Sequence, residues 1–537
     1  MDYQPFRGFA QGFGSHPRRR FLTFATSTLT LALTSRLPVA RATGSDLPPS
    51  QENPFTLGVA SGDPVPDGVV LWTRLAPRPR EVGGGMPPDG AVTVQWQIAA
   101  DEAFRRVVHQ GTARAEAGYG YSIHAEVPGL EPGRTYWYRF RTGPWISPTG
   151  RTRTTPAAGT LPGQARLGLA SCQQYDGGYY TAHAHLAQED LDAVFFVGDY
   201  IYENAITPQA GGRQYPPGEQ VPESFGHECT TLDDYRLRYA LYKSDPQLQA
   251  AHAAHPWCVT WDDHEVENNY AGAVSQDNDP TGLFLQRRAA AYRAYWENMP
   301  LRRAQHPYGA DARLYRRLRY GRLAALHILD TRQYRDDQAY GDGWQYPGPG
   351  SDNPARSITG HAQERWLTQG LDRTGIWHVI PQQVVFSQRK RTVGRSPVSM
   401  DAWDGYPDSR RRILTTAQHT KANLIVLSGD AHAHYAMDIK QDFDDPDSPT
   451  LGAEFVTTSI SSGGDGTATP LDHAAMLGAN PHIKFYNVQR GYTVLTLTPT
   501  DARAEHRTVG FVTRPGAPRR TAAAFITEAG RPGLHPV

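Results

Sequence analysis

Residues 194–203, Val-Phe-Phe-Val-Gly-Asp-Tyr-Ile-Tyr-Glu, join a short apolar run directly to a group of potential metal ligands. Four consecutive apolar residues bounded by glycine are typical of a buried strand. Gly198 lets the backbone turn sharply, so that the Asp199 carboxylate faces the crevice beyond the strand. In open α/β sheets, ligands bind at the carboxyl ends of the strands. The segment therefore predicts an α/β domain with a site at one edge of its sheet.

Four further apolar runs end in polar residues in the same way. They are 167–170 before Ser171-Cys172-Gln173, 257–261 before Asp262-Asp263-His264-Glu265, 383–386 before Ser387-Gln388, and 424–427 before Ser428-Gly429-Asp430-Ala431-His432. A single polar strand end usually caps the next helix, whereas five in succession favour one shared site. Helices are predicted between the runs, one capped at Thr231 and one over 283–296, so the sheet should be largely parallel. Arg287 and Arg288 are expected on a solvated helix face, and 341–354 is expected to be a loop.

The composition is that of an ordinary soluble globular protein. The chain has 537 residues, 39% of them hydrophobic, with 54 basic and 54 acidic residues and no net charge. No basic face for nucleic acid is expected from this balance. Three cysteines, Cys172, Cys229 and Cys258, cannot all pair with one another, which argues against a disulfide scaffold. Cys258 lies within an apolar run and is expected in the core.

The N-terminus has the pattern of a targeting segment. Pro17-Arg18-Arg19-Arg20-Phe21-Leu22-Thr23 is a twin-arginine motif, an apolar run covers 21–33, and Ala40-Arg41-Ala42 offers a cleavage site. Residues 1–42 are therefore predicted to be a signal peptide read by the twin-arginine translocation machinery, which would deliver the protein to the periplasm or the medium. The apolar run is too short for a membrane anchor.

The remaining chain divides by composition. Residues 43–158 are predicted to be all-β, and the turn and alternating aromatics of 130–140 are typical of an immunoglobulin- or fibronectin-like sandwich. A linker rich in Pro and Gly covers 154–163. The catalytic domain is predicted over 164–510, with a C-terminal tail over 511–537. The protein is expected to act as a monomer.

The order of the polar strand ends resembles the signature blocks of calcineurin-like metallophosphoesterases and purple acid phosphatases. Gly198-Asp199-x-x-Tyr202, Asp263-His264-Glu265 and Gly429-Asp430-Ala431-His432 carry this resemblance. The departures from it, such as Cys172 in place of the first aspartate, look like the PhoD family of alkaline phosphatases, which includes calcium-dependent enzymes with phospholipase D activity. The match extends to 53–64, 329–334 and 401–407. It implies a two-sheet α/β sandwich with a metal site at the strand ends.

The resemblance also implies a mixed metal centre. Fe(III) would be held by Cys172, Asp199, Tyr202 and His432, whereas Asp199 would bridge to Ca²⁺, which Asp263 and Asp430 help to bind. Thiolate and phenolate suit a tightly held iron, and carboxylates suit calcium. Asp262 is the alternative to Asp263 as a ligand. Asp263 is preferred because it directly precedes His264.

Two residues are predicted to act on the substrate. His264 is the candidate general acid, or a hydrogen-bond donor to the phosphate, and the alternative is a histidine that only orients Asp263. Arg332 is predicted to bind the phosphate bidentately, and the alternative is a buried pair with Asp330.

The predicted function is hydrolysis of phosphomonoesters at neutral to alkaline pH, with release of inorganic phosphate. One alternative keeps the site but cleaves phosphodiesters, such as phospholipids or cell-wall polymers. Another is a non-catalytic ferric- or surface-binding protein.

Overall fold

The computed structural model describes residues 50–537 except 208–211, 215–220 and 373. The predicted signal peptide, residues 1–42, lies outside the described residues. None of the helices in the described part of the chain is long and apolar enough to cross a membrane.

Two large sheets form the centre of the fold. The ten-stranded sheet runs, in spatial order, through β24 (Arg531–Pro536), β23 (Arg519–Glu528), β22 (Asp501–Val509), β21 (Gly491–Leu497), β9 (Ala165–Ala170), β10 (Ala193–Phe196), β11 (Pro256–Val259), β1 (Val59–Val65), β2 (Gly68–Arg74) and β5 (Ser122–Pro128). The seven-stranded sheet runs through β12 (Arg316–Tyr320), β13 (Ala324–Ile328), β15 (Trp377–Pro381), β17 (Asn423–Ser428), β19 (Thr450–Val456), β18 (His434–Lys440) and β20 (Ile483–Asn487). Parallel pairing is confirmed for β9, β10 and β11 and for β13, β15, β17 and β19, whereas the outer strands are antiparallel.

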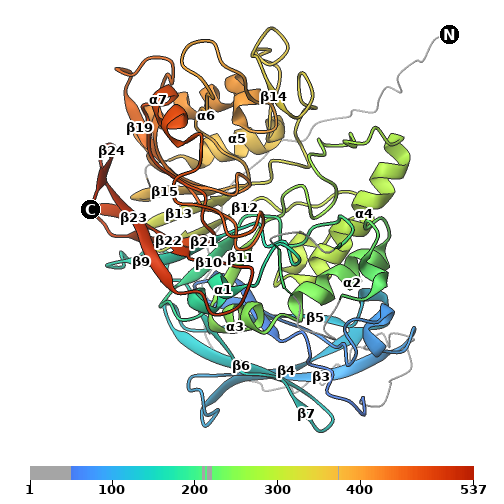
Figure 1. The fold of residues 1–537 in the computed structure, drawn as a ribbon. Coiled ribbons are helices and arrows are strands. Elements are labelled where there is room, and N and C mark those ends of the chain that lie inside the picture. The colour runs from blue at the N-terminus through green and yellow to red at the C-terminus, as the bar shows by residue number, and fades with distance from the viewer. Residues whose placement is uncertain (1–49, 208–211, 215–220, 373) are drawn as a thin grey trace, which may run out of the picture. The chain divides into compact units, whose positions relative to one another are not determined.

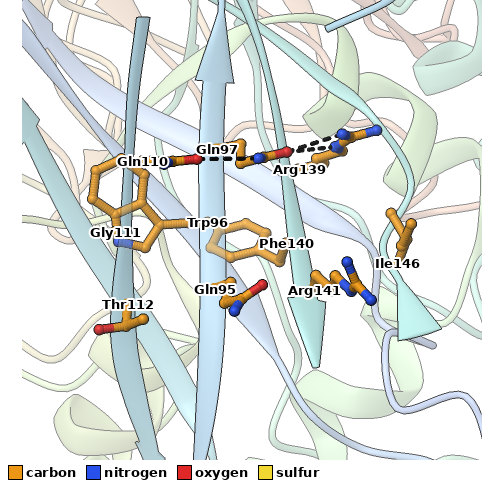
Figure 2. A pocket seen from close by; sticks show the side chains of 10 residues that line it. All are labelled: Gln95, Trp96, Gln97, Gln110, Gly111, Thr112, Arg139, Phe140, Arg141 and Ile146. Carbon is orange, nitrogen blue, oxygen red and sulfur yellow. Dashed lines mark hydrogen bonds between the residues drawn. The ribbon is translucent and has the colours of Figure 1, made fainter. Parts of the chain in front are cut away.

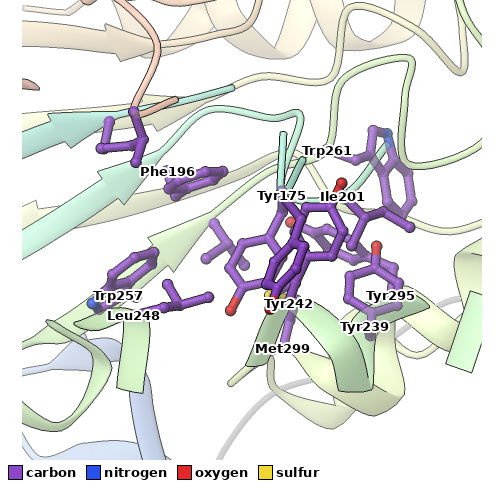
Figure 3. Close-up of a cluster of buried hydrophobic side chains, with 14 of the residues drawn as sticks. Tyr175, Phe196, Ile201, Tyr239, Tyr242, Leu248, Trp257, Trp261, Tyr295 and Met299 are labelled. Carbon is purple, nitrogen blue, oxygen red and sulfur yellow. The ribbon is translucent and has the colours of Figure 1, made fainter. Parts of the chain in front are cut away.

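The central strands are buried on both faces, which explains their continuous apolar sequences. On β10, Phe195 packs with Cys258, Ile425 and Phe455 between the two sheets. The alternate residue Phe196 packs with the helices on the opposite face, in the aromatic cluster of Figure 3. The protein is therefore an α/β sandwich with helices outside both sheets.

Helices cover the outer faces of the two sheets. They are α1 (Thr181–Leu186), α2 (Leu232–Lys243), α3 (Pro246–Ala254) and α4 (Thr281–Asn298) by the ten-stranded sheet, and α5 (Gly360–Gly370), α6 (Pro407–Thr420) and α7 (His473–Ala479) at the top of Figure 1. The capped helix is confirmed, because the Thr231 hydroxyl accepts from Asp234 N–H and the Asp234 carboxylate accepts from Thr231 N–H. The predicted helix 283–296 is confirmed as α4.

The solvated position expected for two arginines of α4 is wrong. Arg287 and Arg288 are 8% and 5% exposed. Arg287 donates to Glu267 at 2.8 Å and to the Tyr235 hydroxyl at 3.0 Å. The loops that follow β11 cover this face of the helix and supply carboxylates, so the polar face of α4 is paired rather than hydrated.

The N-terminal region shares strands with the ten-stranded sheet. Its core lies between β1, β2 and β5 and a separate five-stranded sheet of β4 (Val107–Glu116), β3 (Ala91–Ala99), β6 (Thr135–Thr142), β7 (Trp145–Ile146) and β8 (Gly150–Arg153). The Tyr136 hydroxyl accepts from Glu131 N–H at 2.9 Å and closes the turn before β6. Because β1 pairs in parallel with β11, the N-terminal region and the rest of the fold are joined by a continuous sheet.

Three segments differ from the sequence-based expectation. Residues 511–537 are not a tail, because β23 and β24 complete one edge of the ten-stranded sheet and bury Phe525 and Leu534 between the sheets. The strand expected at 383–386 lies earlier in the chain, as β15 (Trp377–Pro381). Residues 383–386 form a buried loop that follows it. Its apolar residues are buried by packing against α5 and α6, which a local pattern does not distinguish from a strand. The loop predicted at 341–354 contains a two-residue strand, β14 (Trp344–Gln345), paired with β16 (Val398–Ser399).

Candidate metal centre

The predicted ligands follow four strands whose carboxyl ends meet. Cys172 follows β9, Asp199 follows β10, Asp263 follows β11, and Asp430 follows β17 of the other sheet. Four of the predicted ligands hold left-handed backbone angles, with φ of 59° at Cys172, 56° at Asp199, 59° at Asp430 and 50° at His432. Such angles are uncommon for residues with a Cβ and cluster at functional sites. The backbone therefore turns sharply at these residues, and the turns bring the predicted ligand side chains together.

A glycine permits the closest approach between two of these turns. Gly198 has φ 111°, and a Cβ placed there would lie 2.3 Å from the Cβ of Asp262. No side chain fits at this position, so the backbone of the loop after β10 packs directly against Asp262 in the loop after β11.

Three overlapping groups of side chains have ligand atoms within 4.8 Å of one another. They are Cys172 with Asp199 and His432, Asp199 with Asp263 and His264, and Asp262 with Asp263 and Asp430. Asp199 and Asp263 each belong to two groups, so the three form one continuous cluster. The structure thus brings together all the predicted aspartates with Cys172, His264 and His432.

Tyr202 joins the cluster at its sulfur side. Its hydroxyl donates to Asp199 Oδ2 at 2.9 Å, lies 3.1 Å from His432 Nε2 and accepts from Ser462 Oγ at 2.8 Å. Burial, reinforced by the Asp199 carboxylate, raises the pKa of the Cys172 thiol and of the Tyr202 hydroxyl well above their usual values. A bound cation acts in the opposite direction and favours the thiolate and the phenolate.

Three carboxylate oxygens of the cluster lack a hydrogen bond. Asp199 Oδ1, Asp262 Oδ2 and Asp263 Oδ1 are buried without a hydrogen-bond partner among the described residues. Burying such oxygens is costly unless a cation compensates them. The donor set of sulfur, phenol, imidazole and carboxylate groups fits a transition metal on one side and a hard divalent ion on the other. The residues present therefore fit a metal centre.

His264 is held by a carboxylate outside the ligand set. Its Nδ1 lies 2.7 Å from Glu203 Oε2, and its ring centre lies 4.2 Å from that of Tyr202. Burial lowers the pKa of His264, but the charges of Glu203, Asp199 and Asp263 outweigh it and raise that pKa well above the usual value. Asp263 accepts its hydrogen bond from Asn269 N–H at 2.7 Å, so His264 is not the group that orients it.

The guanidinium of Arg332 pairs with carboxylates at the candidate centre, and the alternative prediction of a pair with Asp330 is wrong. Its side chain is fully buried and donates from Nε to Asp262 and from Nη1 to Asp401 at 2.8 Å. Its Nη2 lies 3.4 Å from Asp263 and 3.7 Å from Asp430. Asp330 accepts from the backbone N–H of Arg332 rather than from its guanidinium. The arginine is thus a buried cation that joins four carboxylates of the centre and its surroundings.

The comparisons with known proteins cover nearly the whole of the chain. Residues 167–506 match the family model of the PhoD-like phosphatase, and residues 40–156 match that of the PhoD-like phosphatase N-terminal domain.

The chain belongs to the PhoD-like phosphatase family.

Two members of the family are similar over nearly their full length. The chain is 47% identical over 531 residues to alkaline phosphatase D of Bacillus subtilis (strain 168), covering 97% of this chain and 89% of that protein. A solved structure described as "Structure of PhoD" is 48% identical, with a TM-score of 0.86, covering 91% of this chain and 93% of that one. The family resemblance stated from the motifs is confirmed.

Some residues that complete the site of this PhoD-like phosphatase were not predicted. Glu265 accepts from the backbone N–H groups of Asp199, Tyr200 and Asp262 at 3.0, 2.6 and 2.8 Å, and burial raises its pKa to about 8. It therefore fixes two ligand-bearing turns at once. Both Glu265 and Glu203 directly follow predicted site residues, which was the available signal. Asp401 and Ser462 come from distant segments, and no local pattern marks their role.

Three residues of the 401–407 segment, which forms part of the family resemblance, are buried. Trp403 and Tyr406 are buried in the hydrophobic cluster beneath α6, and Asp404 pairs with Arg410 at 2.8 Å. Their role in the PhoD-like fold is packing.

A separate hollow of about 440 Å³ lies on the five-stranded sheet (Figure 2). Three of its polar side chains form a hydrogen-bonded row, in which Arg139 donates twice to Gln97 and Gln97 donates to Gln110. None of the predicted ligands lines it, so it is distinct from the candidate metal centre.

Proposed function

We propose that this chain hydrolyses phosphomonoesters at neutral to alkaline pH and releases inorganic phosphate. The observation that carries the proposal is the continuous ligand cluster, in which Asp199 and Asp263 each belong to two groups and each keep a buried oxygen without a hydrogen bond. The similar Bacillus protein bears the name alkaline phosphatase D, which supports the same activity. The finer description of the fold, a metallophosphoesterase domain after an immunoglobulin-like sandwich, is part of this proposal.

The proposed metals are Fe(III) and Ca²⁺. Cys172, Asp199, Tyr202 and His432 would hold the iron, and Asp199, Asp263 and Asp430 would hold the calcium. Burial raises the pKa of Asp430 to about 6, so that this carboxyl is largely ionised at neutral to alkaline pH and ready to bind a cation. When bound, such a pair of ions supplies positive charge for phosphoryl transfer and makes water more acidic.

The chain's own residues would supply the proton and the positioning. His264 would donate a proton, or a hydrogen bond, to the departing oxygen, and Glu203 would hold its ring through Nδ1 at 2.7 Å. Arg332 would keep Asp262, Asp263 and Asp430 in place by lying among them, rather than bind the substrate.

The proposal is tested with the exported protein after metal analysis. Hydrolysis of 4-nitrophenyl phosphate should require calcium. Mild chelation should abolish it reversibly while iron stays bound, because carboxylates hold calcium more loosely than thiolate and phenolate hold iron. Asp199→Asn should remove at least about 10²-fold of the activity, because it weakens both groups of ligands. The matched control is Asp438→Asn on β18, where the carboxylate pairs with Lys484 at 3.3 Å. An active protein that ignores chelation, or equal effects of the two substitutions, would refute the proposed centre.

A further inference from the structure

Arg389 is a buried arginine that lacks a carboxylate partner. It is 7% exposed and lies in the segment 388–395 between β15 and β16. Its backbone N–H donates to Asp404 Oδ2 at 2.8 Å, which fixes the residue. Its guanidinium carbon lies 5.5 Å from the ring centre of Trp344 and 5.6 Å from that of Tyr435. No ion pair involves Arg389 within the described part of the chain. A buried charge of this kind is costly without an anion beside it.

This arginine stands beside the candidate metal centre. Its guanidinium lies against the ring of Tyr435, which is three residues after the predicted ligand His432, and no ion pair joins it to Asp430 within the described residues. The Asp430 side chain is 27% exposed, so this side of the centre is open to solvent. Arg389 is therefore placed to meet a molecule that enters next to Asp430.

The same segment carries further cations that stack on aromatic rings. The guanidinium carbon of Arg391 lies 4.2 Å from the Trp344 ring, and that of Arg395 lies 5.1 Å from the Tyr346 ring. Lys390 differs from them, because its ammonium pairs with Asp444. Stacking holds a guanidinium in place without neutralising its charge. Trp344 thus holds Arg389 and Arg391 as two neighbouring cations, neither of which forms an ion pair within the described residues.

Hydrogen bonds fix this segment relative to the metal centre. Asp342, two residues before Trp344, accepts from Asn269 Nδ2 at 2.7 Å, and Asn269 N–H donates to Asp263 at 2.7 Å. After β16, Asp401 accepts from Arg332 at 2.8 Å. Both ends of the β14–β16 pair are therefore attached to groups that contact predicted ligands, as a preorganised subsite requires.

We propose that Arg389, supported by Trp344 and Arg391, binds a second anionic group on the leaving portion of the substrate. The preferred substrates are then phosphomonoesters whose leaving group itself carries a phosphate. This inference rests on the proposed phosphatase activity. A guanidinium matches a phosphate with two parallel hydrogen bonds, and the stacked Trp344 keeps it oriented before the substrate arrives.

A matched pair of substrates tests the subsite. Propane-1,3-diol bisphosphate should exceed propane-1,3-diol monophosphate in kcat/KM by about 10–100-fold in the wild type, the range for hydrogen bonds to a charged group. Arg389→Gln should reduce this ratio to about two, the value that two equivalent reacting ends give by statistics alone. Arg389→Lys should restore part of it. Lys390→Gln, which removes the same charge one residue away, should keep the wild-type ratio because Lys390 is bound to Asp444.

A binding measurement separates this inference from the activity on which it rests. By calorimetry, propane-1,3-bisphosphonate should bind the metal-loaded wild type more tightly than propylphosphonate, and Arg389→Gln should reduce the difference to about the twofold that two equivalent ends give. If neither phosphate ester is hydrolysed, the proposed activity is wrong, and the phosphonates still decide the subsite. Equal binding of the two phosphonates by the wild type, or an unchanged preference in Arg389→Gln, would overturn the subsite.

Discussion

At the scale of single residues, the candidate metal centre is made by side chains whose neighbours hold them in unusual conformations. The left-handed angles at Cys172, Asp199, Asp430 and His432 persist because surrounding groups over-determine them. Glu265 supplies part of that restraint by accepting three backbone N–H groups from two turns. Glu203 does the same for the imidazole of His264. Reactivity and restraint therefore lie in adjacent residues of the chain.

His264→Ala should lower turnover more for poor leaving groups than for activated aryl phosphates. A general acid matters most when the departing oxygen is basic, and it contributes about 10²–10⁴-fold. The measurement is kcat over a series of leaving groups of increasing pKa. Glu203→Gln should follow the same trend more weakly, because His264 keeps its place but loses the charge beside Nδ1. Losses that do not depend on the leaving group would assign His264 a positioning role instead.

Tyr202→Phe and Cys172→Ser should have different effects on the side of the candidate centre for which iron is proposed. A phenolate on Fe(III) should give a visible charge-transfer band, as the resemblance to purple acid phosphatases implies. Tyr202→Phe should bleach or shift that band, and Cys172→Ser should lower iron content and activity together. Cys258→Ser is the matched control, since Cys258 lies between the sheets and belongs to none of the ligand groups. Iron content that falls equally in both serine variants would contradict ligation by Cys172.

At the scale of elements, the predicted ligands follow the ends of strands, and loops from distant parts of the chain hold them through hydrogen bonds. β9, β10 and β11 lie in parallel next to one another, so their carboxyl ends place Cys172, Asp199 and Asp263 at one edge. β17 delivers Asp430 from the second sheet. Ser462, after β19, reaches the Tyr202 hydroxyl at 2.8 Å. The site therefore needs both sheets in register, and elements far from it contribute to its stability.

Leu534→Ala should destabilise the protein by about 2–4 kcal/mol, although it lies near the C-terminus. Leu534 of β24 is 7% exposed and packs between the two sheets, where removal of its side chain leaves a cavity. Leu471→Ala is the matched control, because Leu471 is fully exposed and its loss should change stability by less than about 0.5 kcal/mol. Urea denaturation followed by circular dichroism measures both. Equal midpoints for the two variants would mean that residues 511–537 behave as a tail after all.

At the scale of the whole molecule, the N-terminal region and the rest of the fold share strands. β1, β2 and β5 extend the sheet that carries β9, β10 and β11. A second contact lies at Gly120, in the turn after β4. There Arg236 of α2 donates to Glu297 of α4 at 2.7 Å, and both side chains lie close to the glycine. The described residues therefore form one compact unit.

Export should depend on Arg18 and Arg19. Replacing both by Lys keeps the charge but removes the twin-arginine signal, so an uncleaved precursor should remain inside the cell. Immunoblots of cytoplasmic and exported fractions measure this. A matched control is Arg7→Lys, which makes the same change outside the motif and should leave export intact. Unimpaired export of the double variant would contradict the proposed route.

The sequence by itself determined what the strand ends carry. Apolar runs followed at once by Cys172, Asp199, Asp263 or Asp430 are local patterns, and the carboxyl ends of parallel strands meet by geometry. The clustering of these potential ligands was therefore predictable without coordinates. The capped helix at Thr231 was readable for the same reason.

Only the tertiary structure decided which distant groups meet. Arg332 lies among Asp262, Asp263, Asp401 and Asp430, which belong to three separate segments, so no local pattern distinguished this role from phosphate binding. The strands of residues 511–537 and the buried arginines of α4 were missed because burial there depends on partners remote in sequence. Potential ligands that follow a strand can be recognised from consecutive residues. The pairing of charges and the filling of the core depend on long-range contacts, and these set the final geometry of the centre.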